Sequence, residues 1–271
     1  MEVSGQNYTE KLFEQNRSPE ANHSNRGANF AAVTVVMLVM RTFGDAFLQW
    51  LETLRFPAPL PDDVEVLDPY REPAVRDAVA AFARRYYDDT APRIGIFGIN
   101  PGRFGAGTTG LSFTDPYALG KLCGIPHSLG NGRELSATFV YETIAAFGGV
   151  ERFYRRFYMS ALVPLGLVRG GRNLNFYDDP RVERVAVPFI VETLWQQIAF
   201  PLHRQVAIVL GSGKLRRIAE QLNAEHRFFE RLIVLEHPRF VMQYRRRRLA
   251  EYVERYVRAY HDALTLCGLP S

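Results

Sequence analysis

A glycine-rich stretch, GINPGRFGAGTTGLSF at residues 98–113, combines side chains that could do chemistry together. It contains an uncharged amide at Asn100, four glycines over residues 102–110, and aromatic rings at Phe104 and Phe113. Glycine lets the backbone approach a ligand closely, and a flat apolar ring beside converging N–H donors suits a planar heterocycle. The stretch therefore predicts a pocket for a nucleobase-like ring. The alternative is a structural turn whose phenylalanines belong to the core.

A second stretch, Gly211 to Lys214 (GSGK), follows an apolar run and opens a helical pattern. Backbone N–H groups at a helix start can hold an anion. The stretch is not a nucleotide-binding P-loop, because GxxxxGK[ST] is required and Ile208 and Leu215 stand at its first and last positions. We predict a single phosphate contact by Ser212 and Lys214, with a tight turn as the alternative.

Other catalytic arrangements find little support. There is no GxSxG nucleophile elbow, and a pair of Ser212 with His237 would lack the third member of a triad. The six histidines have no metal-ligand spacing, and the two cysteines, Cys123 and Cys267, cannot form a four-cysteine metal or iron–sulfur site. We expect no metal and no other cofactor, and reduced cysteines favour a cytoplasmic protein.

These stretches follow apolar runs that are typical of buried strands, being short, rich in branched residues and bounded by glycine or proline. The runs occupy residues 93–102, 157–165, 205–211 and 231–237. Helical patterns cover residues 42–55, 71–87, 133–147, 181–199, 214–223 and 243–264. Four strands alternating with helices predict an α/β fold of three layers, α/β/α, around a four-stranded parallel sheet.

The carboxyl ends of parallel strands meet at one edge of a sheet, and ligands of open α/β sheets bind there. In this chain that edge collects Asn100, Pro164 to Gly166, the GSGK stretch, and Glu236-His237-Pro238. We therefore predict that Asn100 and His237 lie at the same edge.

The stretch 98–113 closely resembles motif 1 of the uracil-DNA glycosylase superfamily, in particular of its single-strand-selective monofunctional branch. That pattern is G-[IM]-N-P-G-x-F-G, followed by T-G and an aromatic residue. Its anchors are all present, at Gly98, Asn100, Pro101, Gly102, Phe104, Gly105, Thr109, Gly110 and Phe113. His237-Pro238 is similar to the start of motif 2, and Gly170 to Leu174 (GGRNL) resembles an SGRNL segment of the branch. The resemblance spans about residues 90–250.

The resemblance implies a uracil-DNA glycosylase-like fold and a monofunctional DNA glycosylase, which flips a damaged base from DNA and hydrolyses its bond to the sugar to start base excision repair. By the same resemblance, Asn100 orients the attacking water, and His237 donates a hydrogen bond to the departing base as its negative charge develops. Phe113 would stack on the base, and the backbone around Ile99 and Gly102 would bind its edge. The expected partner is DNA that contains uracil or another deaminated base. We expect the protein to act as a monomer and to have no membrane partner.

One departure from the branch concerns base reading. The branch places a base-reading asparagine on its second strand, and counting back from Pro164 puts that position at Ala161. Asn173 and Asn175 are the candidate substitutes for that amide, and Ser160, beside Ala161, is a further candidate base-binding residue. The substrate range could therefore extend from uracil to xanthine or another deaminated base.

A second departure follows His-Pro, where the branch continues Ser-Pro-Arg-Asn and this chain has Arg239, Phe240, Val241 and Met242. The corresponding loop wedges into DNA in the family, so we expect residues 239–242 to fill the gap left by the flipped base.

An arginine run at residues 245–248 begins the last predicted helix. Cations in a first helical turn oppose the helix dipole, so helix stability does not explain the run. We predict that Arg245 and Arg246 contact DNA phosphates, with a solvated charge cluster as the alternative.

The net charge is weakly positive, at +4 from 33 Lys and Arg against 29 Asp and Glu. Nearly all the cations are arginines, since the only lysines are Lys11, Lys121 and Lys214. A positive excess favours an anionic partner such as DNA, and arginine suits bidentate phosphate contacts. A GC-rich genome would favour arginine equally well.

We expect residues 1–40 to be a disordered or mis-assigned extension and residues 41–266 to form a single uracil-DNA glycosylase-like catalytic domain. Residues 28–40 are apolar, but they are shorter than the roughly 20 residues that a membrane span needs. The RTFGDAF sequence that follows offers a poor cleavage site for a signal peptide. Translation from Met37 or Met40 would explain this segment.

Two rival functions remain open at this level. A catalytically silent DNA-binding relative would bind uracil-containing DNA normally and yield no abasic product. A hydrolase of free nucleosides or nucleotides, using the same pocket, would bind DNA weakly even at low salt.

Overall fold

The computed structural model describes residues 41–57 and 59–270, and the expected extension at residues 1–40 lies outside this part. The strands are β1 (Val64–Leu67), β2 (Arg93–Gly98), β3 (Phe157–Ala161), β4 (Gly166–Arg169), β5 (Arg172–Asn173), β6 (Leu202–Leu210) and β7 (Arg231–Leu235). The α-helices are α3 (Phe43–Thr53), α4 (Pro73–Tyr86), α5 (Ala106–Thr109), α6 (Leu135–Phe147), α7 (Val150–Tyr154), α8 (Pro180–Ile198), α9 (Lys214–His226), α10 (Pro238–Tyr244) and α11 (Leu249–Leu266). Short 3₁₀ or π-helical turns are η1 (Pro69–Arg71), η2 (Ala118–Leu122) and η3 (Arg246–Arg248).

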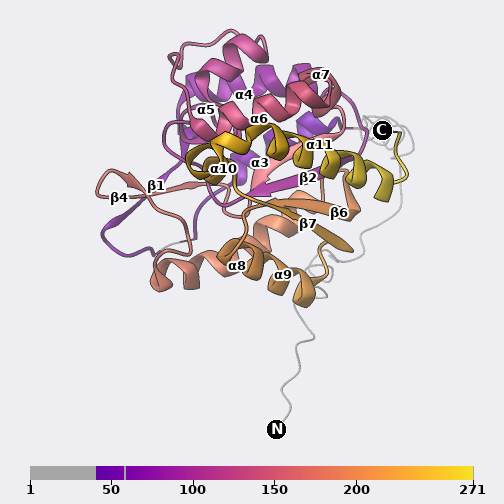
Figure 1. Ribbon diagram of the computed structural model, residues 1–271. Coiled ribbons are helices and arrows are strands. Elements are labelled where there is room, and N and C mark those ends of the chain that lie inside the picture. The colour runs from indigo at the N-terminus through magenta and orange to yellow at the C-terminus, as the bar shows by residue number, and fades with distance from the viewer. Residues whose placement is uncertain (1–40, 58, 271) are drawn as a thin grey trace, which may run out of the picture. The chain divides into compact units, whose positions relative to one another are not determined.

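The larger sheet has four parallel strands in the order β3-β2-β6-β7. All six residues of the central strand β2 are buried, as expected for a parallel strand covered on both faces. Figure 1 shows α8 and α9 below this sheet and α4, α6 and α11 above it. The predicted three-layer α/β/α fold with a four-stranded parallel sheet is therefore confirmed.

Each of these strands ends one to four residues before its predicted end. The glycine, proline and polar residues that follow the apolar runs belong to loops at the carboxyl edge. Shorter strands leave more loop at that edge, and the loops carry the candidate site.

Local sequence explains where two of the helices begin. The Thr42 hydroxyl accepts a hydrogen bond from the Asp45 N–H, and the Asp45 carboxylate accepts one from the Thr42 N–H, which closes a capping box at α3. The Asp179 carboxylate caps α8 by accepting from the Arg181 N–H at 2.8 Å, and Pro180 fills the first helical position.

A second sheet, antiparallel and ordered β1-β4-β5, was not predicted. Arg169 pairs with Arg172 across the β4–β5 hairpin, so Gly170 and Gly171 form a two-residue turn. Their φ angles are 52° and 70°, in the left-handed region that such a turn requires and that glycine adopts without strain. Figure 1 shows β1 and β4 beside the main sheet.

The prediction of one continuous last helix over residues 243–264 is wrong. Residues Pro238–Tyr244 form α10, Arg245 leaves the helical conformation at φ −126° and ψ 14°, and the arginine run continues through η3 into α11. The run occupies the corner between two helices, so the dipole argument for a first helical turn does not apply to most of it.

Buried apolar side chains of the described residues form one continuous cluster that includes both helix layers and the sheet. None of the helices within residues 41–57 and 59–270 is long and apolar enough to cross a bilayer.

Candidate active site

A cavity of about 50 Å³ opens at the carboxyl edge of the parallel sheet. Residues of the 98–113 stretch form most of its wall, and Glu134, Ser136, Ala161 and His237 complete it. Asn100 and His237 both belong to this wall, so the prediction that they lie at the same edge is confirmed.

Asn100 follows β2, and two backbone groups of one distant segment hold its side-chain amide. Its Nδ2 donates to the Leu174 carbonyl at 3.0 Å, and its Oδ1 accepts from the Phe176 N–H at 3.1 Å. A further contact from Nδ2 to the Pro101 carbonyl is 3.5 Å, long for a hydrogen bond. Because the nitrogen faces an acceptor and the oxygen faces a donor, the orientation of the amide is fixed.

His237 follows β7 and is the N-cap residue of α10. Its Nδ1 accepts from the Arg239 N–H at 3.2 Å, which leaves the ring proton on Nε2. Burial lowers the pKa of His237 to about 4, and the positive charge of Arg239 acts in the same direction. The imidazole is therefore neutral at physiological pH and can donate a hydrogen bond from Nε2.

Phe113 has a φ of 55°, in a region that residues with side chains rarely adopt. Its ring lies against Gly98, because a Cβ built on Gly98 would stand 2.5 Å from Cζ of the ring. The ring centroid is 6.0 Å from that of His237. Gly98 therefore makes room for an aromatic wall between the end of β2 and the histidine.

Glu134 lines the cavity and was missed from the sequence. A Cβ on Gly105 would overlap its carboxylate, and a Cβ on Gly102 would lie 3.5 Å from Oε1. Burial raises the pKa of Glu134, and the charge of Arg239 opposes that effect. The motif glycines thus leave space for an acidic group. No pattern points to it, because its proximity to the glycines is set by the fold.

Among the other predicted base-binding residues, Ile99 and Gly102 line the cavity and Phe104 does not. The Phe104 side chain is 60% exposed, and the Arg103 guanidinium lies 4.4 Å from its ring centroid. The structure therefore places Phe104 on the surface beside the cavity instead of inside it.

Ser160 and the two candidate substitutes for the missing asparagine, Asn173 and Asn175, also lie outside the cavity wall. Ser160 is buried on the other face of β3 from Ala161 and lines a separate small cavity with Tyr158. Asn173 accepts a hydrogen bond from the Arg103 N–H at 3.1 Å, so it holds the motif loop. Asn175 is half-buried in a turn. Ala161 itself lines the cavity, and neither Asn173 nor Asn175 brings a substitute amide to the cavity wall.

Val241 is fully buried, so its predicted role in contacting DNA is wrong. The four residues after His-Pro are helical, and α10 turns Val241 toward the core while Arg239 and Phe240 remain exposed. Tyr244, one helical turn beyond Phe240, is 66% exposed, with its ring centroid 5.4 Å from that of Phe240. Instead of an irregular loop, α10 exposes an aromatic pair, Phe240 and Tyr244.

The remaining residues predicted to contact DNA differ in exposure and in whether their side chains are already paired. Ser212, Arg245 and Arg246 are exposed. Lys214 is instead paired, because its Nζ lies 2.7 Å from Glu183 Oε2 and donates to a backbone carbonyl. Its charge is largely neutralised before any phosphate arrives.

The cavity brings together an aromatic ring at Phe113, a neutral imidazole at His237 and an oriented amide at Asn100. None of the described residues that line it is a lysine or a cysteine. Within residues 41–57 and 59–270, no three His, Cys, Asp or Glu side chains gather closely enough to bind a metal ion.

The family model of the uracil DNA glycosylase superfamily matches residues 85–261 of this chain. The crystal structure of wild-type SMUG2 from Pedobacter heparinus is similar, with 37% sequence identity and a TM-score of 0.79. That match covers 82% of this chain and 98% of the SMUG2 chain. No curated protein sequence matches the chain.

Proposed function

Because this chain belongs to the uracil DNA glycosylase superfamily, we propose that it is a monofunctional DNA glycosylase that removes uracil from DNA by hydrolysis. The observation that carries the proposal is the single cavity in which Asn100, Phe113 and His237 meet. We propose that uracil enters this cavity after rotating out of the DNA stack, and that its ring lies on Phe113.

In this mechanism the bond between C1′ and the base breaks, and its electron pair leaves with the base. The neutral His237 donates from Nε2 to the base oxygen on which negative charge develops, and such a donor typically contributes about 10²–10³ in rate. A water molecule bonds to C1′ and releases its proton to solvent. Asn100 orients that water, and a strong base is unnecessary because the sugar carries cationic character.

We propose that the cavity also accepts xanthine or a related deaminated base. Ala161 provides no amide that would restrict the site to a pyrimidine edge. Glu134 also lines the cavity, and a carboxylate that reached the base would favour bases that offer N–H groups. Both uracil and xanthine offer such groups.

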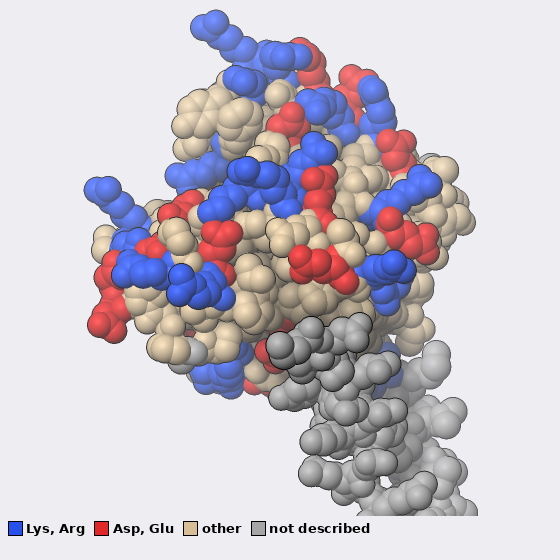
Figure 2. Space-filling model, turned by 90° about the horizontal axis from the view of Figure 1, so that it is seen from below, with Lys and Arg blue, Asp and Glu red and all other residues tan. Residues whose placement is uncertain are grey.

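The DNA strand would contact the surface of α10, the helix that His237 caps, where Arg239, Phe240 and Tyr244 are exposed, together with Arg245 at its end. Figure 2 shows that the face seen from below, on the side of α8 and α9, mixes Lys and Arg with Asp and Glu. That face is therefore not uniformly basic. We propose that the enzyme acts as a monomer in the cytoplasm, where Cys123 and Cys267 remain free thiols.

The test is to incubate oligonucleotides that carry uracil, xanthine, hypoxanthine or a thymine mismatch and then to cleave abasic sites with alkali. We expect strand cleavage with uracil. Tight binding of uracil-containing DNA without cleavage would identify a silent DNA-binding relative. Release of uracil from free deoxyuridine, with weak DNA binding, would identify a nucleoside hydrolase.

A further inference from the structure

The contacts of the Asn100 amide determine which of its atoms is free for a water molecule. A side-chain amide has two N–H donors and two acceptor positions on its oxygen. One N–H donates to Leu174, the other points toward the Pro101 carbonyl, and one acceptor position is taken by Phe176. Among the described contacts, the second acceptor position on Oδ1 remains open. Asn100 can therefore accept a hydrogen bond from water at Oδ1, while its second N–H makes only the long, 3.5 Å contact with the Pro101 carbonyl.

Both partners of the amide belong to residues 173–178, which we name the clamp segment. Its first residue, Asn173, pairs with Val168 in the β4–β5 hairpin, and the Leu174 N–H donates to the Leu167 carbonyl at 2.9 Å. The amino-terminal end of the clamp segment is thus fixed to the small antiparallel sheet.

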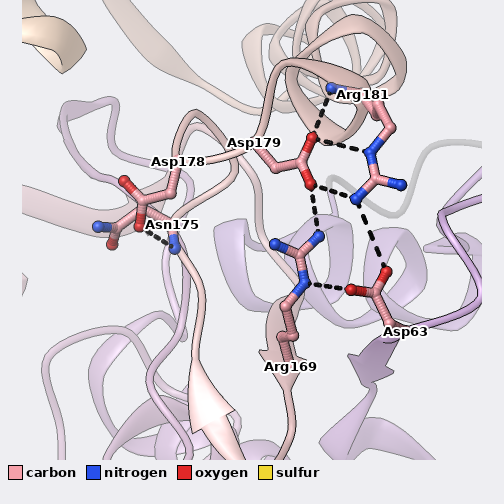
Figure 3. Close-up of polar contacts among 6 residues, drawn as sticks. All are labelled: Asp63, Arg169, Asn175, Asp178, Asp179 and Arg181. Carbon is pink, nitrogen blue, oxygen red and sulfur yellow. Dashed lines mark hydrogen bonds and ion pairs between the residues drawn. The ribbon is translucent and has the colours of Figure 1, made fainter.

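A turn closes the middle of the clamp segment around Phe176. The Asn175 N–H donates to Asp178 Oδ2 at 3.0 Å, and the Asp178 N–H donates back to the Asn175 carbonyl at 2.9 Å. Figure 3 shows the contact between the Asp178 side chain and the Asn175 backbone. This turn holds the N–H of Phe176 in place for Asn100.

An ionic network fixes the residue that follows the clamp segment. Asp179 accepts from Arg169 at 2.5 Å and from Arg181 at 2.7 Å, and Arg169 also pairs with Asp63 at 2.8 Å (Figure 3). Asp179 and its two arginines come from α8 and the hairpin, so the carboxyl-terminal end of the clamp segment is tied to two elements. The two arginines hold the pKa of Asp179 well below its usual range, so the network stays ionised.

We infer that the clamp segment positions Asn100 for catalysis, by turning the amide so that its oxygen offers an open acceptor position to the attacking water. This role rests on the proposed hydrolysis, and it adds the segment that orients Asn100 toward the attacking water. It also assigns a role to the GGRNL stretch, whose last residue supplies the carbonyl that fixes the amide nitrogen.

By its contacts, the clamp segment would favour an amide over a carboxylate at position 100. In an Asn100→Asp variant, one oxygen would face the Phe176 N–H favourably, and the other would face the Leu174 carbonyl from the place of Nδ2. Two acceptors in contact repel, so the pKa of the new carboxyl group would rise and its protonated form would take the place of the amide.

The first experiment measures single-turnover excision of uracil by wild type and Asn100→Asp between pH 5 and pH 8. We expect the variant-to-wild-type rate ratio to rise as the pH falls, by up to about tenfold per pH unit while the carboxylate form dominates. Glu134 and His237 line the same cavity, and Arg239 and Asp115 act on Glu134. These groups are common to both proteins, so the ratio isolates position 100. A ratio that rises with pH would mean that an unclamped carboxylate acts as a base, and would overturn the inference.

The second experiment loosens the turn with Asp178→Ala, using Asp178→Asn as the conservative variant and Asp77→Ala as the control. Asp178 and Asp77 are both exposed, and Asp77 lies on α4. We expect Asp178→Ala to lower the single-turnover rate about tenfold, as misplaced catalytic groups do, with unchanged affinity for an uncleavable 2′-fluoro-deoxyuridine oligonucleotide. Asp178→Asn keeps the acceptor and should restore most of the rate. Equal rates for Asp178→Ala and Asp77→Ala would overturn the inference.

A third measurement separates this inference from the proposed function. In ¹⁵N NMR spectra of the wild type, one side-chain amide proton of Asn100 should exchange slowly with water, because it is bonded to Leu174. Asp178→Ala should speed that exchange, and Asp77→Ala should not. If the wild type cleaved no base but showed this protection, the proposed function would fail and the clamp would stand. Fast exchange in the wild type would refute the clamp.

Discussion

Asn100 and His237 face the same cavity, but they are held in opposite ways. The partners of Asn100 lie 74 and 76 residues away along the chain. The partner of His237 is the backbone of Arg239, two residues away. The amide is thus oriented by tertiary structure, whereas the imidazole is oriented by the start of its own helix. The two groups are proposed to act on opposite sides of one bond. Substitutions in distant segments should therefore disturb Asn100, whereas changes at the start of α10 should disturb His237.

The largest expected effect comes from removing each group and varying the leaving base. His237→Ala should lower the rate of uracil excision by about 10²–10³, because it removes a donor to the developing anion. The reduction should be smaller for 5-fluorouracil, which leaves more easily. Asn100→Ala should give a similar reduction on both bases, since water and sugar are unchanged.

The measurement is single-turnover cleavage of both bases in the same oligonucleotide. If His237→Ala were impaired equally on both, or kept wild-type rates, the histidine would not serve the leaving base. Binding of the uncleaved DNA should survive both changes, because phosphates supply most of the affinity.

The second effect concerns pH and only the histidine side of the comparison. The pKa of His237 is lowered from 6.5 to about 4. As the pH falls, His237 is therefore protonated at a lower pH in the folded protein than in the unfolded chain. Above pH 6.5 both states are neutral at this residue. Between about pH 6.5 and 4 the unfolded chain gains a proton that the folded state lacks, and the folded protein loses stability.

We therefore expect His237→Asn, which can keep an N-cap acceptor, to lose less thermal stability than wild type between pH 7 and pH 5. Thermal unfolding of both proteins across that range is the measurement. Parallel loss of stability in the two proteins would show that His237 does not titrate with a lowered pKa.

The third effect tests the surface next to His237. Phe240→Ala with Tyr244→Ala should reduce cleavage of paired DNA by about tenfold more than cleavage of single strands, because extruding a base from a duplex costs a few kcal/mol. Val241→Ala is the matched control. It should lower stability by about 1–2 kcal/mol because it leaves a cavity in the core, without a preference for either DNA form. Equal reductions on both DNA forms in the double variant would argue against a wedge.

The smallest effect concerns the arginine corner. Arg245→Ala with Arg246→Ala should weaken DNA binding about equally for all sequences. The slope of log affinity against log salt should fall by about one unit for each phosphate that the variant no longer binds. Arg84, an exposed arginine of α4, provides the control. An unchanged slope would mean that the corner does not meet the DNA backbone.

The parts of the structure that sequence predicted well are those that local patterns encode. Apolar runs indicated the four parallel strands, and their ends brought Asn100 and His237 to one edge. The failures have a common cause. Val241 was placed in an irregular loop, and only the helical phase of α10 shows that it is buried. Ser160 alternates with Ala161 along β3, so its side chain lies on the opposite face of the strand.

Contacts made between distant segments left almost no trace in the sequence. The carbonyl of Leu174 and the N–H of Phe176 are backbone groups, which any residue but proline would supply. Glu134 is one acidic residue among many, and only the folded chain brings it against Gly102 and Gly105. The β4–β5 hairpin could have been found, because paired glycines between strand-forming residues indicate a two-residue turn.

The wide sequence separation between Asn100 and the clamp segment also affects the order in which the site forms during folding. Closing a loop between residues 74 apart is slower than forming a helix start, since contacts between distant residues dominate folding times. His237 can acquire its tautomer as soon as α10 forms, whereas Asn100 must wait for β4, β5 and α8 to dock. A refolding chain would therefore orient His237, the proposed leaving-group donor, before Asn100, the proposed water-binding amide. During refolding, glycosylase activity should return later than helical circular dichroism.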